Sequence, residues 1–137
     1  MNMRRLRKLV ATLLLSVMSF NIFADGTVVS PGQQATVTIA PNGVPIVNIN
    51  APNAGISVTN FQEFNVGANG EVINNADNTG RSYVAGLIPG NPNYGPNQAA
   101  QLIILQVNGS NRSTIEGYLE VLSRSKPNVI LSNENGI

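Results

Sequence analysis

The sequence ILQVNGSN at residues 104–111 is an apolar run that ends in an asparagine-rich turn, and this arrangement occurs four times in the chain. The other three copies are IVNINAPN at residues 46–53, EVINNADN at 71–78 and VILSNENG at 129–136. Their turn asparagines are Asn50, Asn75, Asn108 and Asn133, so the successive intervals are 25, 33 and 25. Repeats of this length predict stacked solenoid units, with a β-sandwich as the alternative. In stacked coils, asparagines at the bends are expected to form hydrogen bonds from rung to rung.

Most of the remaining chain predicts short β-strands separated by tight turns. The predicted strands are Ala35–Ala40, Pro45–Ile49, Phe61–Val66, Glu71–Ile73, Leu102–Val107, Ile115–Val121 and Asn128–Leu131. Asn-Gly pairs, which tolerate positive φ and favour turns, occur at 42–43, 69–70, 108–109 and 135–136. In the strand predicted at 115–121, Ile115, Gly117, Leu119 and Val121 form an inward face. Residues 97–105 are the one helix candidate, and we interpret them as a loop leading into a strand.

Residues 1–24 have the organisation of a secretory signal peptide. Four basic residues between positions 4 and 8 precede an apolar run at Leu9–Phe20, and Ala24 closes a cleavage site. The alternative, a membrane anchor, would need a longer apolar run of about 20 residues. We therefore expect residues 1–24 to be removed on export and residues 25–137 to form one domain.

Removal of the signal peptide changes the net charge. Residues 25–137 keep four of the eight basic residues and all seven acidic ones, which gives a formal charge of 4 − 7 = −3. No basic patch remains that would bind nucleic acid. The chain has no Cys and no His. The lack of cysteine in an exported protein has two explanations: a core that needs no disulfides, or the need to thread an unlinked chain through an outer-membrane pore.

Five segments, in this order, resemble one known family. They are GISVTNFQEFNV (55–66), GEVINNADN (70–78), AGLIPGNPNY (85–94), LIILQVNGSNRSTIEGYLEV (102–121) and NVILSNENGI (128–137). Together they resemble the N-terminal secretion domain, also called the TPS or haemagglutination activity domain, of filamentous-haemagglutinin-like two-partner-secretion exoproteins. These exoproteins include large haemolysins and contact-dependent-inhibition toxins. The family has two signature motifs, NPNL and NPNGI.

This chain has both signatures, with one change in each. The two motifs are Asn91-Pro92-Asn93-Tyr94, with Tyr for Leu, and Asn133-Glu134-Asn135-Gly136-Ile137, with Glu for Pro. Tyr keeps a large side chain, whereas Glu frees a φ angle that Pro would fix. Asn followed by Pro favours a type I turn, and we expect turn formation to explain both motifs better than direct contact with a partner. We also expect Ile137 to enter the core.

The resemblance implies an all-β domain: a right-handed parallel β-helix with N-terminal capping strands and no catalytic residue, metal or cofactor. It implies recognition in the periplasm of a Gram-negative bacterium by the POTRA domains of a dedicated outer-membrane β-barrel transporter. The domain would lead a secreted or cell-surface exoprotein through that barrel and act as its folding template. Contacts with host cells or glycans would belong to a C-terminal body. Since the chain stops after the second motif, we expect an incomplete β-helix, and this chain would be a truncated product, a fragment of a longer protein, or a chain that pairs with another.

We do not expect catalysis. The chain has no His base and no Cys nucleophile. Along one strand Glu116 and Glu120 would lie about 13 Å apart, which exceeds the roughly 6.5–9.5 Å of an inverting carboxylate pair. A solvated polar face explains these two residues better. The alternative function is a self-contained surface adhesin that binds carbohydrate or another chain.

Overall fold

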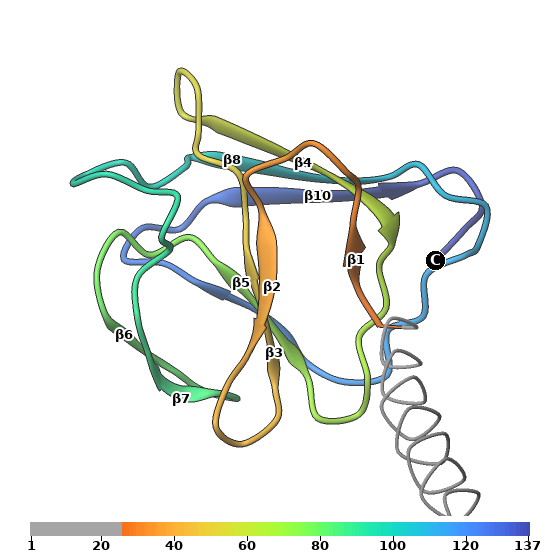
Figure 1. Cartoon of the computed structure of the whole chain (residues 1–137), viewed down its shortest axis with the longest axis horizontal. Coiled ribbons are helices and arrows are strands. Elements are labelled where there is room, and N and C mark those ends of the chain that lie inside the picture. The colour runs from red at the N-terminus through yellow and green to blue at the C-terminus, as the bar shows by residue number, and fades with distance from the viewer. Residues whose placement is uncertain (1–25) are drawn as a thin grey trace, which may run out of the picture.

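Figure 1 shows the computed structural model, which describes residues 26–137. The predicted signal peptide, residues 1–24, lies outside the described residues. The described chain forms ten β-strands and no helix, and so no helix that could cross a membrane. The strands are β1 (Val28–Val29), β2 (Thr36–Ile39), β3 (Pro45–Asn48), β4 (Ile56–Glu63), β5 (Glu71–Asn74), β6 (Gly80–Ser82), β7 (Gly86–Ile88), β8 (Leu102–Val107), β9 (Leu119–Leu122) and β10 (Asn128–Asn133). The all-β prediction is confirmed.

Eight of these strands form two four-stranded sheets. Sheet A has the order β1-β4-β8-β10, and sheet B has the order β2-β3-β5-β9. From β3 onward the chain passes from one sheet to the other, because β3, β5 and β9 lie in sheet B and β4, β8 and β10 lie in sheet A. In Figure 1 β4, β8 and β10 of sheet A run across the top of the molecule, with β3 and β5 of sheet B below them. The hairpin β6–β7 is the one departure from this alternation.

Within each sheet, the strands that follow the N-terminal strand are parallel and in register. Ile46 of β3 pairs with Val72 of β5, and Leu102 of β8 pairs with Asn128 of β10, so each step advances the numbering by 26. The steps from β4 to β8 and from β5 to β9 advance it by 46 and 48, because the segment 75–101 makes a detour through β6 and β7. The predicted interval of 25 therefore comes close to a true step. The predicted interval of 33 does not, because it joins β5 to β8, which lie in different sheets.

Antiparallel pairs occupy the N-terminal edge of both sheets. β1 pairs antiparallel with β4, and β2 pairs antiparallel with β3. The hairpin β6–β7 is also antiparallel. Both sheets are therefore mixed, and the parallel pairing expected of a β-helix is found in β3-β5-β9 and β4-β8-β10.

Two apolar clusters hold these layers together. The main core lies between the sheets and contains Val47, Ile49, Phe61, Phe64, Val66, Ile73, Ala100, Ile103, Leu105 and Val107. The rings of Phe61 and Phe64 meet edge to face within it, with centroids 5.1 Å apart. The second cluster packs the β6–β7 hairpin against the outer face of sheet B and contains Ala40, Val44, Ile46, Val72, Ala85 and Ile88. The detour thus covers the outer face of sheet B.

Two strand predictions were misplaced. β4 begins at Ile56, whereas the predicted strand began at Phe61. β9 begins at Leu119, and Ile115, expected to point inward, is 41% exposed. Leu119 and Val121 do pack against the main core, so the alternation is correct only where the strand exists. Residues 97–101 form a loop that leads into β8, as predicted.

Candidate functional site

The first signature motif forms the expected turn in the detour between β7 and β8. The backbone N–H of Tyr94 donates to the carbonyl of Asn91 at 3.0 Å, which closes a four-residue turn with Pro92 at its second position. Pro fixes φ near the value that this position requires. The side-chain oxygen of Asn91 also accepts from the backbone N–H of Asn93 at 2.8 Å. Two hydrogen bonds therefore define the shape of the motif from within.

The Asn91 side chain joins this turn to two successive strands of sheet B. Its Nδ2 donates to the carbonyl of Ile49, just after β3, at 3.0 Å and to the carbonyl of Asn74, in β5, at 2.9 Å. The side chain is 3% exposed. Both carbonyls lie where a strand of sheet B ends, and a buried carbonyl without a partner is costly. Asn91 therefore acts as a clamp across the ends of β3 and β5.

Asn93 and Tyr94 extend the clamp. The Nδ2 of Asn93 donates to the carbonyls of Asn48 and Ile49, at 3.2 and 3.1 Å. The Tyr94 hydroxyl donates to Oδ1 of Asn75 at 2.7 Å, and its ring packs against the main core. Burial raises the pKa of this hydroxyl above its usual value, so it stays a donor. All three residues therefore bind the folded chain itself.

Asparagines bond from rung to rung within a strand as well as at one of the predicted turn positions. The Nδ2 of Asn74 donates to Oδ1 of Asn48 at 3.0 Å, which links β5 to β3 inside sheet B. Of the predicted turn residues, Asn75 also bonds to the next rung: its Nδ2 donates to the hydroxyl of Ser123, just after β9, at 3.0 Å, and it exchanges two hydrogen bonds with the backbone of Ala100. Asn48 and Asn74 carry a recognisable signal, since each is a polar residue within a strongly apolar strand.

The second signature motif closes the same kind of turn at the far end of β10. The N–H of Gly136 donates to the carbonyl of Asn133 at 3.0 Å, and Oδ1 of Asn133 accepts from the N–H of Asn135 at 2.9 Å. The predicted turn is therefore present despite Glu134. Ile137, however, is 55% exposed and does not enter the core, which corrects that expectation.

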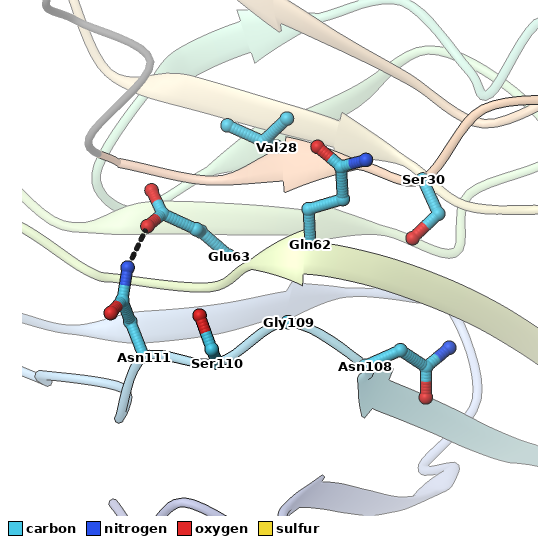
Figure 2. A pocket seen from close by; sticks show the side chains of 8 residues that line it. All are labelled: Val28, Ser30, Gln62, Glu63, Asn108, Gly109, Ser110 and Asn111. Carbon is cyan, nitrogen blue, oxygen red and sulfur yellow. Dashed lines mark hydrogen bonds between the residues drawn. The ribbon is translucent and has the colours of Figure 1, made fainter.

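Three of the four Asn-Gly pairs adopt the expected positive φ, at Gly43, Gly70 and Gly136. Gly109 does not, and it is required for another reason: a Cβ at this position would overlap the carbonyl oxygen of Gln62. The turn that contains Gly109 lines an open polar pocket beside the end of β4 (Figure 2). In this pocket Glu63 accepts from the side chain of Asn111 at 2.6 Å. The glutamate is thus already paired within the chain.

The interpretation of Glu116 and Glu120 as one solvated face is wrong for Glu120. Its carboxylate accepts from the Ser82 hydroxyl at 3.1 Å and from the backbone N–H of Tyr83 and Val84, at 3.1 and 3.0 Å. Glu120 therefore ties β9 to the β6–β7 hairpin, whereas Glu116 is exposed. Among residues 26–137, no group of three or more His, Cys, Asp or Glu is placed to hold a metal ion.

The model of the TPS secretion domain family matches residues 21–137. The chain belongs to this family. The TPS domain is also similar to a solved structure, the filamentous hemagglutinin secretion domain, with 36% identity and a TM-score of 0.72 over 80% of this chain and 36% of that one. The tRNA nuclease CdiA of Escherichia coli O6:K15:H31 (strain 536 / UPEC) is 44% identical over 83% of this chain. The Hemolysin of Proteus mirabilis is 39% identical over 95% of it.

This TPS domain corresponds to a small part of those relatives. It covers 4% of the CdiA chain and 8% of the Hemolysin chain. The shared part is the one that the family and the solved structure both name for secretion. A secretion-targeting role is therefore the function of this domain, and the comparisons do not favour the alternative of a self-contained adhesin.

Proposed function

We propose that this TPS domain forms the first coils of a right-handed parallel β-helix that leads a larger exoprotein out of a Gram-negative cell. The observation that carries the proposal is the family match over residues 21–137. The fold supports it, because the chain alternates between two sheets and stacks β5 on β3 and β10 on β8 in parallel register. Antiparallel β1 and β2 cap one end, and the outer edges of β9 and β10 are free to pair with a further coil. Free parallel edges are what a folding template offers.

The proposed partner is a dedicated outer-membrane β-barrel transporter with POTRA domains, which meets the chain in the periplasm. A chain without Cys is free of disulfides that would block passage through a pore. Extended apolar segments of the unfolded chain would add to a POTRA sheet by backbone pairing. Parallel pairing between strands so far apart in the sequence is slow to form, which favours export before folding.

We propose that the first signature motif serves export through folding rather than by contact with the transporter. The support is its burial: Asn91 is 3% exposed and both hydrogens of its amide are used inside the chain. Loss of the clamp would free the ends of β3 and β5. The first coil would then not fold stably outside the barrel, and its folding would no longer draw the rest of the chain out. The second motif, which is more exposed, remains the better candidate for direct contact.

Co-expression with the cognate transporter tests this proposal. The double variant Asn91→Ala/Asn93→Ala should reduce the amount of exported protein at least about tenfold, as expected if folding drives release. The matched control is Asn53→Ala/Asn69→Ala, which removes two exposed side chains that donate no hydrogen bond within residues 26–137. Binding of the purified POTRA domains to urea-unfolded chain should be equal for wild type and the clamp variant. Normal export of the clamp variant, or selective loss of POTRA binding, would contradict a folding role.

We propose no reaction and no cofactor for this domain. The nuclease names belong to relatives of which this chain covers 4%, so the activity of those proteins has no support here. Binding to host cells or to glycans would equally belong to a C-terminal body. For this chain we propose export through the periplasm to the cell surface or the medium.

A further inference from the structure

Glu71, the first residue of β5, is a carboxylic acid placed inside the protein. It is 1% exposed, and by strand alternation its side chain points to the same side as Ile73, into the main core. Its Oε2 lies 3.0 Å from the hydroxyl of Thr27, and its Oε1 is buried without a hydrogen-bond partner. An ionised carboxylate with only one hydrogen bond is costly at such depth.

The contacts of the Thr27 hydroxyl indicate that the Glu71 carboxyl is protonated in the folded chain. Its oxygen lies 3.0 Å from Oε2 of Glu71 and 3.3 Å from the backbone carbonyl of Asn65. The hydroxyl has one hydrogen, and the carbonyl only accepts. Each contact has a hydrogen of its own only if Glu71 is protonated and donates to Thr27, which then donates to Asn65. With Glu71 ionised, the hydroxyl must turn to the carboxylate and gives up the carbonyl.

We propose that Glu71 is a proton-linked latch: the first coil takes up one proton at this carboxyl when it folds, and the proton holds the Gly26–Val29 segment against the core. This segment has few other attachments. The strand β1 is two residues long and pairs irregularly with β4. The Nδ2 of Asn65 donates to the carbonyl of Gly26 at 3.0 Å. The link from Thr27 to Glu71 therefore adds to the β1–β4 pairing, the bond from Asn65 and the packing of Val29 against the main core.

Among residues 26–137, no charged side chain faces this carboxyl. The acidic groups on the adjoining elements are Glu63, Glu116 and Glu120, and they face Asn111, solvent and the β6–β7 hairpin, respectively. Tyr118, which precedes β9, is 70% exposed. Burial raises the pKa of Glu71 from 4.5 to about 7, against a smaller lowering by the Thr27 hydroxyl. The raised pKa of Glu71 is therefore due to its burial in the core.

The sign of the pH effect follows from the raised pKa. The folded state is favoured in full below pH 4.5, the pKa of the unfolded chain, and this advantage is lost as the pH rises through about 7. Between about pH 5 and pH 8 the folding equilibrium constant should fall about 70-fold. The chain has no His, so no side chain with an ordinary pKa titrates in this window.

Urea unfolding of the full chain across this pH range tests the proposal without any transporter, so its result is independent of the proposed function. Wild type should show the fall of about 70-fold in the folding equilibrium constant, as linkage requires. Glu71→Gln cannot ionise but still offers Thr27 a donor, so its folding equilibrium constant should vary by less than about threefold over the same range. The matched control Glu116→Gln, at an exposed site, should keep the wild-type dependence. A flat wild-type profile, or an unchanged fall in Glu71→Gln, would overturn the proposal.

Two measurements on wild type keep the test decisive if Glu71→Gln does not fold. Carbon-13 NMR of the Glu71 carboxyl should titrate with a midpoint near 7, and a midpoint near 4.5 would overturn the proposal. Hydrogen exchange, corrected for intrinsic rates, should show the amides of Val28 and Val29 losing protection with rising pH before those of Ile103 and Leu105. A uniform loss at all four positions would rule out a latch on the N-terminal segment.

Discussion

In the first signature motif Asn91 is buried at 3% exposure, whereas Asn133, at the same place in the second motif, is half-buried and followed by an exposed Asn135. The two motifs use the same internal bonds, a backbone bond that closes the turn and an Asn side chain that accepts from the residue two positions later. Their outward bonds differ. Asn91 reaches strand-end carbonyls of two rungs, whereas Asn133 reaches the carbonyl of Asn111 and the hydroxyl of Ser113, both in one loop.

The two motifs show that the shape of a turn and its contribution to the stability of the fold are separate properties. Equivalent turns form in both places, and even a Glu in place of Pro leaves the second one closed. The contribution of a motif to the free energy of unfolding depends on which groups accept its side-chain amide hydrogens. A buried carbonyl that loses its donor has no water to replace it. We therefore expect substitutions at the first motif to act on the whole fold and those at the second motif to act locally.

Asn91→Ala should give the largest effect. It leaves the carbonyls of Ile49 and Asn74 without this donor and the N–H of Asn93 without its acceptor. We expect the free energy of unfolding to fall by about 3 kcal/mol, since each buried group left unpaired costs about 1–3 kcal/mol. Urea unfolding of the full chain measures this change.

Asn91→Asp is the informative companion to that variant. It keeps an acceptor for the N–H of Asn93 but loses the donor, so its cost should approach that of Asn91→Ala. A cost under about 1 kcal/mol for both variants, the ordinary value for an exposed hydrogen bond, would mean that burial does not set the weight of the clamp.

Tyr94→Phe should have the second-largest effect. The ring keeps its packing against the main core, and only the hydrogen bond from the hydroxyl to Asn75 is lost. We expect a loss of about 1.5 kcal/mol, because the Oδ1 of Asn75 keeps its bond to the N–H of Ala100. Thermal or urea unfolding measures the loss, and a change as large as that of Asn91→Ala would place the centre of the clamp at Tyr94 instead.

Much of this architecture follows from the sequence. The all-β class, the seven strand regions apart from two misplaced starts, and both turns were predictable because Asn, Gly and Pro act through local backbone preferences. The repeat was predicted only in part. The true step, from Ile46 to Val72 and from Leu102 to Asn128, is close to the predicted interval of 25, but the interval of 33 between β5 and β8 is no step at all. A pattern in one dimension does not indicate which of two sheets a strand joins.

The start of β4 was missed because its pattern is inverted. Ser57 and Thr59 point inward with 0% exposure, and the apolar Ile56 and Val58 point outward at 41%. The inward hydroxyls bind the bend before the strand: Ser57 donates to the carbonyl of Asn50 at 2.6 Å, and the N–H of Asn50 donates to Thr59 at 3.1 Å. Apolar-in alternation does not detect a strand whose interior positions serve a bend. The carbonyl partners of Asn91 were hidden for a different reason: they lie far from it in the sequence, at Ile49 and Asn74.

Asn133→Ala should cost about 1 kcal/mol, a third of the effect at Asn91, because water can reach the carbonyl of the exposed Asn111 and only the hydroxyl of Ser113 is left buried without this donor. Hydrogen exchange should locate the change in residues 109–113 and in the turn itself, since Asn111 and Ser113 lose their donor there. Loss of protection in β3 and β5 as well would show that the two motifs are coupled, which the comparison of their depths does not predict.

Glu134→Pro should give the smallest effect and the only gain. Glu134 takes the same turn position as Pro92, so the φ that Pro imposes is already close to that of the folded turn. Replacement by Pro should stabilise the chain by about 0.4–1 kcal/mol, because it removes conformations from the unfolded chain without adding a contact. The reciprocal variant Pro92→Glu should lose a similar amount, measured by urea unfolding. Because this effect belongs to the unfolded state, it should be nearly equal at the buried and the exposed motif. A destabilised Glu134→Pro would show instead that the two turns differ in backbone geometry and not only in depth.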